Sequence, residues 1–91
     1  MTDVSKIENF VDRLESLAGA YELSESFRKA ISRCKLSITM YKMSDKYADE
    51  VYKSFGNVWG QANLHYQWHE HAYRKSPLVN YLGEVIVEGG F

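Results

Sequence analysis

Apolar residues recur every three or four positions through most of the chain, which is the spacing of one face of an α-helix. In the first such run, Ser5 and Glu8 have the spacing of a capping box, in which the two side chains satisfy backbone donors at a helix start. We therefore expect an amphipathic helix that begins at Ser5 and ends near Gly19. Its apolar face would be formed by Ile7, Phe10, Val11, Leu14, Leu17 and Ala18.

A second helical pattern begins at residue 25, directly after Ser24, a residue type that caps helix N-termini. Segment 36–42 also alternates between apolar and polar residues, as a half-buried strand does. The helical spacing continues from Phe27 to Tyr41 with no flanking Gly or Pro, so the pattern favours a helix. The apolar positions are Phe27, Ala30, Ile31, Cys34, Ile38 and Tyr41.

Residues 48–73 keep a seven-residue repeat, which is typical of a long helix packed on its neighbours at shallow angles. Gly56 and Gly60 each cost about 1 kcal/mol relative to alanine in a helix interior, and Gly-Asn is a turn signal. Because the apolar phase continues across them, we expect one helix, and a kink at residues 56–57 stays open. The three columns of the repeat are Ala48, Phe55, Ala62, His69; Val51, Val58, His65, Ala72; and Tyr52, Trp59, Tyr66, Tyr73.

The C-terminal region carries two different signals. Ser76 and Pro77 end the preceding helix and can start a short one that reaches Leu82. The tail 84–91 looks extended, because Val85, Ile86 and Val87 are β-branched and glycines flank them. A strand here would need a partner, either segment 36–42, a second copy of the chain or another protein, whereas packing of the tail along the bundle needs none.

Taken together, the patterns predict an all-α single domain over residues 1–91: a small bundle of about three helices, the third long, plus a short extended or helical C-terminal tail. Cys34 is the only cysteine, so no internal disulfide forms, and a reducing compartment is expected. There is no signal-peptide pattern at the N-terminus and no apolar run of membrane-spanning length, and we expect a cytoplasmic protein without membrane contact.

Charge is unevenly distributed along the chain. Residues 1–25 carry six acidic side chains against two basic ones, and residues 26–44 carry five basic side chains and no acidic one. An acidic first helix packed beside a basic second helix explains this pattern, and an anion-binding or nucleic-acid-binding face is the alternative. That alternative face would consist of Arg28, Lys29, Arg33, Lys35 and Lys42.

His65 and His69 are four residues apart and would project from the same helix face, as two ligands of a metal ion can. The H-E-x-x-H motif is absent and no second pair completes a four-ligand site, so we favour a packing role and expect neither metal nor cofactor. Cys34 lies on the apolar face of its helix, where a thiol is usually inert. With no phosphate-binding loop and no G-x-S-x-G motif, the sequence predicts a protein that is not an enzyme.

The aromatic residues of the third helix are the best candidates for partner binding. Tyr and Trp combine a large apolar area with a polar group, and they dominate the energetics of protein interfaces. We therefore expect a protein-interaction module that binds another protein or itself, as a homodimer or larger oligomer, through this face or the C-terminal tail. Small regulatory and inhibitory proteins of phages and mobile elements share this size and character, by analogy only. The candidate residues are Tyr52, Trp59, Tyr66, Trp68 and Tyr73.

Overall fold

Four α-helices and one short 3₁₀ helix make up the part of the chain that the computed structural model describes, which is residues 3–18, 23–69 and 76–87. No strand occurs within those ranges. The all-α prediction is confirmed, and the described helices are the three that were expected plus a helical C-terminal segment, which was one of the two alternatives for the tail. The helices are α1 (Val4–Leu17), α2 (Glu25–Met43), α3 (Ala48–His69) and α4 (Pro77–Val87), and the 3₁₀ helix η1 (Asp45–Tyr47) joins α2 to α3.

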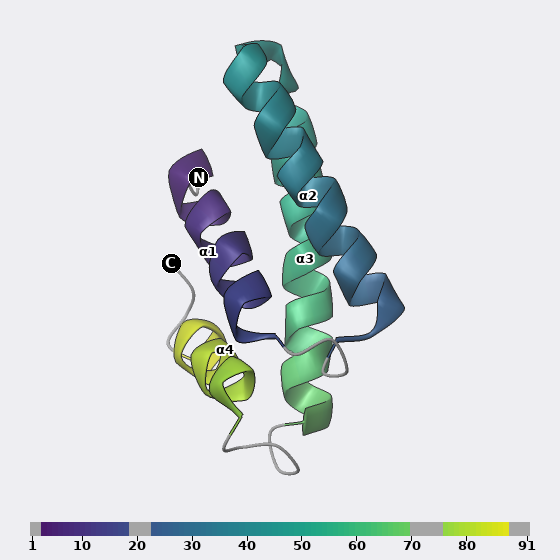
Figure 1. Cartoon of the computed structure of the whole chain (residues 1–91), viewed down its shortest axis with the longest axis vertical. Helices are drawn as coiled ribbons and strands as arrows, with labels where there is room; N and C mark the ends of the chain where they lie inside the picture. The colour runs from purple at the N-terminus through teal and green to yellow at the C-terminus, as the bar shows by residue number, and fades with distance from the viewer. Residues whose placement is uncertain (1–2, 19–22, 70–75, 88–91) are drawn as a thin grey trace.

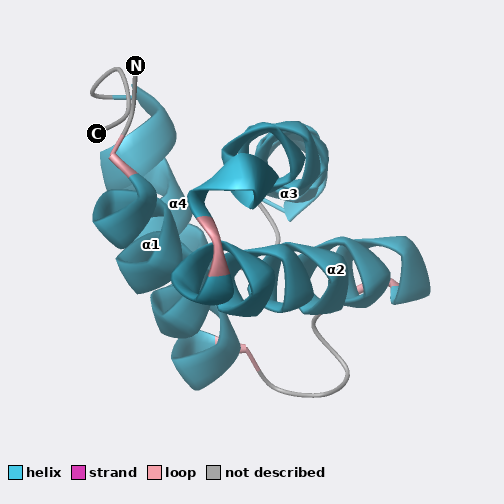
Figure 2. Cartoon of the chain, turned by 90° about the horizontal axis from the view of Figure 1, so that it is seen from above, coloured by secondary structure: helices cyan, strands magenta, loops and turns pink. Residues whose placement is uncertain are grey.

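Helices α2 and α3 form an antiparallel hairpin that runs along the long axis of the molecule (Figure 1). Their contact is the most extensive between any two elements. Helix α1 packs against α2, while α4 packs against α3 and touches α1, so that α1 and α4 lie together on one side of the hairpin (Figure 2). The other side of the hairpin faces solvent.

Helix α1 begins one residue earlier than the sequence pattern predicted, and with a different cap. The Asp3 side chain accepts a hydrogen bond of 3.1 Å from the backbone N–H of Ser5, which identifies Asp3 as the N-cap. The predicted capping box of Ser5 and Glu8 is therefore wrong. The Glu8 carboxylate instead accepts a hydrogen bond from the Lys42 ammonium on α2, so its role is to join two helices.

Helices α2 and α3 follow the predicted periodicity. Ser24 caps α2 by accepting a hydrogen bond of 3.2 Å from the backbone N–H of Phe27, as predicted. Segment 36–42 lies inside α2, so it is neither a strand nor a strand partner for the tail. Helix α3 continues through residues 56–57 without a break, because its apolar contacts on both sides of the glycines keep one phase. Residues 70–73 of the predicted helix lie outside the described residues.

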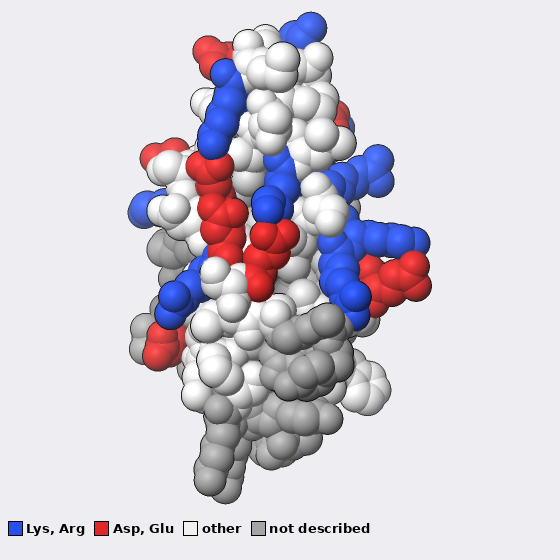
Figure 3. Space-filling model, in the orientation of Figure 1, with Lys and Arg blue, Asp and Glu red and all other residues white. Residues whose placement is uncertain are grey.

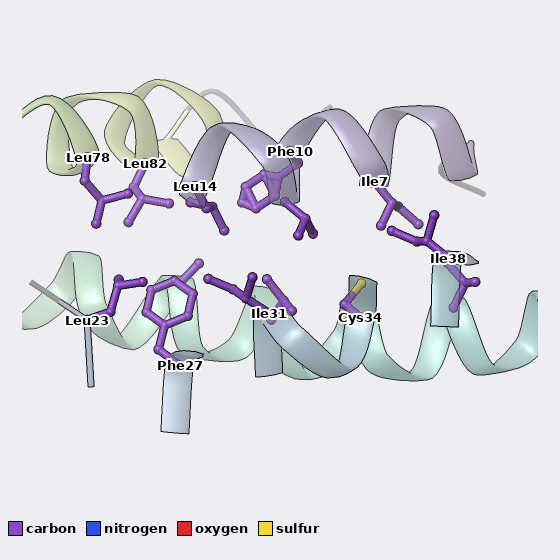
Figure 4. Close-up of a cluster of buried hydrophobic side chains, with 14 residues drawn as sticks. Ile7, Phe10, Leu14, Leu23, Phe27, Ile31, Cys34, Ile38, Leu78 and Leu82 are labelled. Atoms are coloured by element: carbon purple, nitrogen blue, oxygen red, sulfur yellow. The ribbon is translucent and has the colours of Figure 1, made fainter. Parts of the chain in front are cut away.

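The core is a single apolar cluster in which all four helices take part. Residues of α1 point across the interior toward residues of α2, and α4 contributes Leu78 and Leu82 at one end (Figure 4). The buried members are Ile7, Phe10, Val11, Leu14, Leu23, Phe27, Ile31, Cys34, Ile38, Val51, Val58, Ala62, Leu78 and Leu82. The buried apolar face predicted for each of the first three helices is therefore largely confirmed.

Helix α4 corrects the prediction for the C-terminal region. Pro77 occupies the first helical position, as predicted, but the helix runs to Val87 rather than stopping at Leu82. Leu78, Leu82 and Ile86 are spaced by four residues and pack on or against the core, so burial of a helical face outweighs the strand preference of the β-branched residues. Of the two conformations that the sequence left open for the C-terminal tail, the helical one is therefore confirmed for residues 85–87, and residues 88–91 lie outside the described residues.

Two glycines in helices offer a test of how closely α4 approaches α3. A Cβ atom added at Gly83 would lie 3.3 Å from Cε1 of Tyr66, whereas one added at Gly56 would meet no atom within 4 Å. We expect Gly56→Ala to raise the free energy of unfolding by about 0.5–1 kcal/mol through helix propensity. Gly83→Ala should raise the free energy of unfolding by less than this, or lower it, because the Tyr66 ring must move to make room for the added methyl group. Urea denaturation at low protein concentration measures both, and equal gains would contradict this packing.

Candidate interaction surface

The aromatic flank of α3 is largely covered by the chain's own helices. The Trp59 ring lies 5.7 Å from the Phe10 ring of α1 and 6.0 Å from the Phe55 ring, measured between centroids. Phe10 also contacts Phe55 at 6.1 Å and Tyr81 of α4 at 5.9 Å. Tilted and edge-to-face pairs of this kind contribute about 0.5–1.5 kcal/mol each beyond the area they bury. Trp59 therefore belongs to a junction that holds α1, α3 and α4 together.

Two other candidates from the flank also contact the interior. Tyr52 and Tyr66 are half-buried and pack against the core cluster. The Tyr66 ring fills the space left by the missing side chain of Gly83, as described above. Tyr73 lies outside the described residues. Within the described part of the flank, Trp59 thus lies toward α1 and Tyr66 toward α4, while Tyr52 packs against the core cluster, so only the edges of these rings are left for an external partner.

Trp68 differs from the rest of the aromatic candidates because its side chain points into solvent. It is 77% exposed, and it lies one helical turn beyond Leu64, which is 49% exposed. Both residues line an open cleft of about 300 Å³ at the end of the hairpin where α3 ends and α2 begins. The other lining residues are Ser24, Phe27, Gln61, His65 and His69.

The two histidines lie together in this cleft, as their spacing predicted. Their ring centroids are 4.5 Å apart, and the His65 ring stands edge-on to Phe27 at 5.6 Å. His65 therefore packs beside a buried aromatic residue of α2. Among the described residues there is no group of three or more His, Cys, Asp or Glu side chains placed to hold a metal ion. His71 lies outside the described residues.

The basic side chains of α2 are partly engaged by acidic partners. Nζ of Lys35 lies 2.7 Å from Glu15, and Nζ of Lys42 lies 2.6 Å from Glu8, so both lysines pair with α1. Acidic and basic side chains alternate along the junction of these helices (Figure 3). Lys29 pairs with Glu25 at 3.2 Å. These contacts agree with the explanation that an acidic first helix packs beside a basic second one.

The remaining two basic candidates differ in their contacts. The Arg28 guanidinium donates a hydrogen bond of 3.3 Å to the backbone carbonyl of Leu23. Arg33 is exposed and forms no ion pair within the described ranges. The five residues of the predicted anion-binding face therefore do not form one free row of cations.

Most of the large exposed apolar side chains among the described residues belong to the α2–α3 hairpin. We define the outer face by Leu36 and Met43 on α2 and by Gly56, Gly60, Leu64 and Trp68 on α3. Leu36 and Met43 are 61% and 82% exposed. From Ser54 to His69, α3 contains no Asp, Glu, Lys or Arg, although a quarter of the whole chain is charged. A helix that faced only water over this length would normally carry charges there.

Sequence reasoning identified Trp68 but missed most of this face. In the sequence, Gly56 and Gly60 were interpreted only as residues that could break the helix. Leu36, Met43 and Leu64 were not predicted to lie at the surface. The signal that could have found the face is the absence of charge between Lys53 and Glu70, combined with glycines that interrupt neither the helix nor its apolar phase.

Cys34 is buried in the core between α2 and α3. Burial raises the pKa of its thiol above the ordinary value, and a hydrogen bond with the Ser54 side chain opposes that effect in part. The thiol is therefore protonated and enclosed near neutral pH, which is the opposite of the environment that activates a nucleophilic cysteine.

No helix in the described part of the chain combines the length and the apolar character needed to cross a bilayer. Comparisons of the chain with protein-family models, with curated proteins and with solved structures return no match.

The two tryptophans of α3 should respond differently to truncation. Trp59→Ala removes the ring that joins Phe10 and Phe55, so we expect a loss of about 3–5 kcal/mol in the free energy of unfolding. Trp68→Ala removes an exposed ring and should change it by about 0.5 kcal/mol or less. Urea denaturation of both variants checks the assignment of the flank to intrachain packing. A small loss in the free energy of unfolding for Trp59→Ala would instead indicate that this ring is available to bind a partner.

Cys34 should be nearly inert in the folded protein. Because its pKa is raised and its side chain is enclosed, we expect reaction with an aromatic disulfide reagent at about pH 8 to be tenfold or more slower than in urea. The folded protein should react more slowly because its raised thiol pKa disfavours the reactive thiolate, which forms more readily in the unfolded chain. The rate of release of the reagent's chromophore measures this, and similar rates with and without urea would place the thiol at the surface.

Proposed function

We propose that this chain is a non-enzymatic protein-interaction module, a small regulatory or inhibitory accessory protein that acts by covering part of another protein surface. One observation carries the proposal, namely the outer face of the α2–α3 hairpin, where exposed apolar side chains border a helix surface without charge. Interface cores are depleted of charged residues and enriched in tryptophan and methionine, and the outer face has both features.

Leaving this face in water has a cost in free energy. Leu36, Met43 and Trp68 expose most of their side chains, and covering such groups is worth about 25 cal/mol per Å² of apolar area removed from water. Trp68 is the strongest single contributor, because it exposes a large ring beside the cleft and tryptophan is enriched among interface hot spots.

The proposal moves the expected binding residues within α3. Tyr52, Trp59 and Tyr66 face the chain's own helices, so they support the outer face from behind rather than forming it. Trp68 remains from the original candidates, and Leu64 joins it. A protein partner is favoured over a polyanion, because Lys35 and Lys42 are already paired with α1 and are lost from the predicted anion-binding face.

A double variant tests this function. Leu64→Ser with Trp68→Ser removes the apolar groups beside the cleft, and both positions are exposed enough that the fold should be unaffected. We expect native mass spectrometry of the protein, isolated gently from its producing cells, to show an assembly for the wild type and the bare chain for the double variant. The assembly would contain either a second copy or another protein chain.

Val87→Ser is the matched control for this experiment. Val87 is exposed on α4, away from the outer face, and the change has the same chemical character. It should retain the assembly. A wild-type protein that is isolated as a bare chain, or an assembly that survives the double variant, would overturn the proposed function.

A further inference from the structure

The cleft between α2 and α3 is lined by two histidines that are not part of the outer face. His65 and His69 lie there together, beside the buried ring of Phe27. We propose that these two histidines bind an exchangeable transition-metal ion of the Zn²⁺ class, with two imidazole ligands from α3 and water in the remaining positions. The site does not depend on the proposed function, because it uses different side chains.

The separation of the two rings fits a shared ion. Their centroids lie 4.5 Å apart. In a zinc site the imidazole nitrogens lie about 2.0–2.1 Å from the ion, which places each ring centroid about 3.2 Å from it. Two such rings with an N–Zn–N angle of about 90–110° have centroids about 4.5–5.2 Å apart. The observed distance lies at the lower limit of this range, so small rotations of the side chains bring two nitrogens to one ion.

Helix α3 holds the pair in place before an ion binds. A spacing of four residues puts both side chains on one face of the helix, one turn apart. Both are half-buried and line a cleft that opens to solvent, so an ion can enter. Each imidazole has two nitrogens, so one can bind the ion while the other keeps a hydrogen bond that orients the ring.

The other side chains of the cleft decide which ions fit. Among its described lining residues there is no Asp, Glu or Cys, and no Lys or Arg that would repel a cation. Mg²⁺ and Ca²⁺ are bound mainly by carboxylate and carbonyl oxygens, whereas neutral imidazole suits Zn²⁺, Ni²⁺ and Cu²⁺. Ser24 and Gln61 also line the cleft, and their polar groups can hydrogen-bond to water held by the ion.

The number of ligands sets the strength of binding. Within the described ranges no third His, Cys, Asp or Glu joins the pair. Two imidazoles hold an ion more weakly than the four ligands of a structural zinc site, so the ion should exchange and the chain should fold without it.

Isothermal titration calorimetry of the purified full chain with Zn²⁺ tests the site. We expect one ion to bind per chain with a dissociation constant in the micromolar range, and His69→Gln to weaken binding about tenfold or more. Because only the folded chain holds the two rings together, Zn²⁺ should also shift unfolding of the wild type to higher urea concentration and leave His69→Gln nearly unchanged. A wild type that binds no Zn²⁺, or a His69→Gln variant that binds it equally well, would overturn the proposal.

Two further variants separate the spacing of the histidines from their number. In the His69→Gln background, Gln61→His restores a pair four residues apart and should recover most of the lost affinity. Asn57→His is the matched control, because it adds the same side chain eight residues, or about 12 Å along the helix, from His65. Every variant keeps His71, which lies outside the described residues, so any contribution from it is common to all. Equal Zn²⁺ affinity of the two double variants would show that only scattered histidines bind the ion, and the proposal would fail.

Discussion

The antiparallel contact between α2 and α3 is the constraint on which the rest of the structure depends. Phe27, Ile31, Cys34 and Ile38 form one apolar stripe of α2, and Val51, Val58 and Ala62 form the matching stripe of α3. The short connection through η1 keeps the two helices in register. Helices α1 and α4 are each too short to be stable alone in water, so they are helical because the hairpin gives their apolar faces something to cover.

The position of α1 and α4 on the hairpin decides which side of it remains exposed. Phe10 anchors α1 through its rings to Phe55 and Trp59, and Tyr81 brings α4 to the same junction. The ion pairs of Glu8 and Glu15 with α2 lie along the edge of that contact, where partial exposure limits each to about 1 kcal/mol or less. One side of the hairpin is thus covered by α1 and α4, and the outer face stays exposed to solvent.

The sequence predicted the helices better than it predicted their ends and their surroundings. Periodicity placed the buried faces of the first three helices, because a 3.6-residue repeat depends only on which residues are buried. It left residues 85–87 open between a strand and a helix, because their β-branched side chains favour a strand. Packing of the helix beside Leu78 and Leu82 decides for the helix, since propensity is a weaker term than burial. The sequence pattern also assigned Glu8 to a local cap, because one sequence does not show that Lys42, distant in the chain, lies beside it.

The candidate surface shows the same division between local pattern and tertiary context. A repeat of apolar residues indicates that something covers them, and only the fold shows that α1 and α4 cover Trp59 and Tyr66 while Trp68 stays exposed. For the glycines of α3, neither the local pattern nor the fold of the single chain explains the residue type. Gly56 and Gly60 weaken the helix by about 1 kcal/mol each relative to alanine, and no contact within the chain requires them.

A helix that tolerates this cost on a charge-free surface has the features of a helix that meets another one closely, because only glycine lets two backbones approach without side chains between them. The exposed Leu64 and Trp68 on the same ridge supply the apolar area that such an approach would bury. Under the proposed function, stability of the single chain and association with a partner are therefore opposed at Gly56 and Gly60. Packing of the hairpin alone does not explain glycine at these two positions, whereas close approach of a partner would.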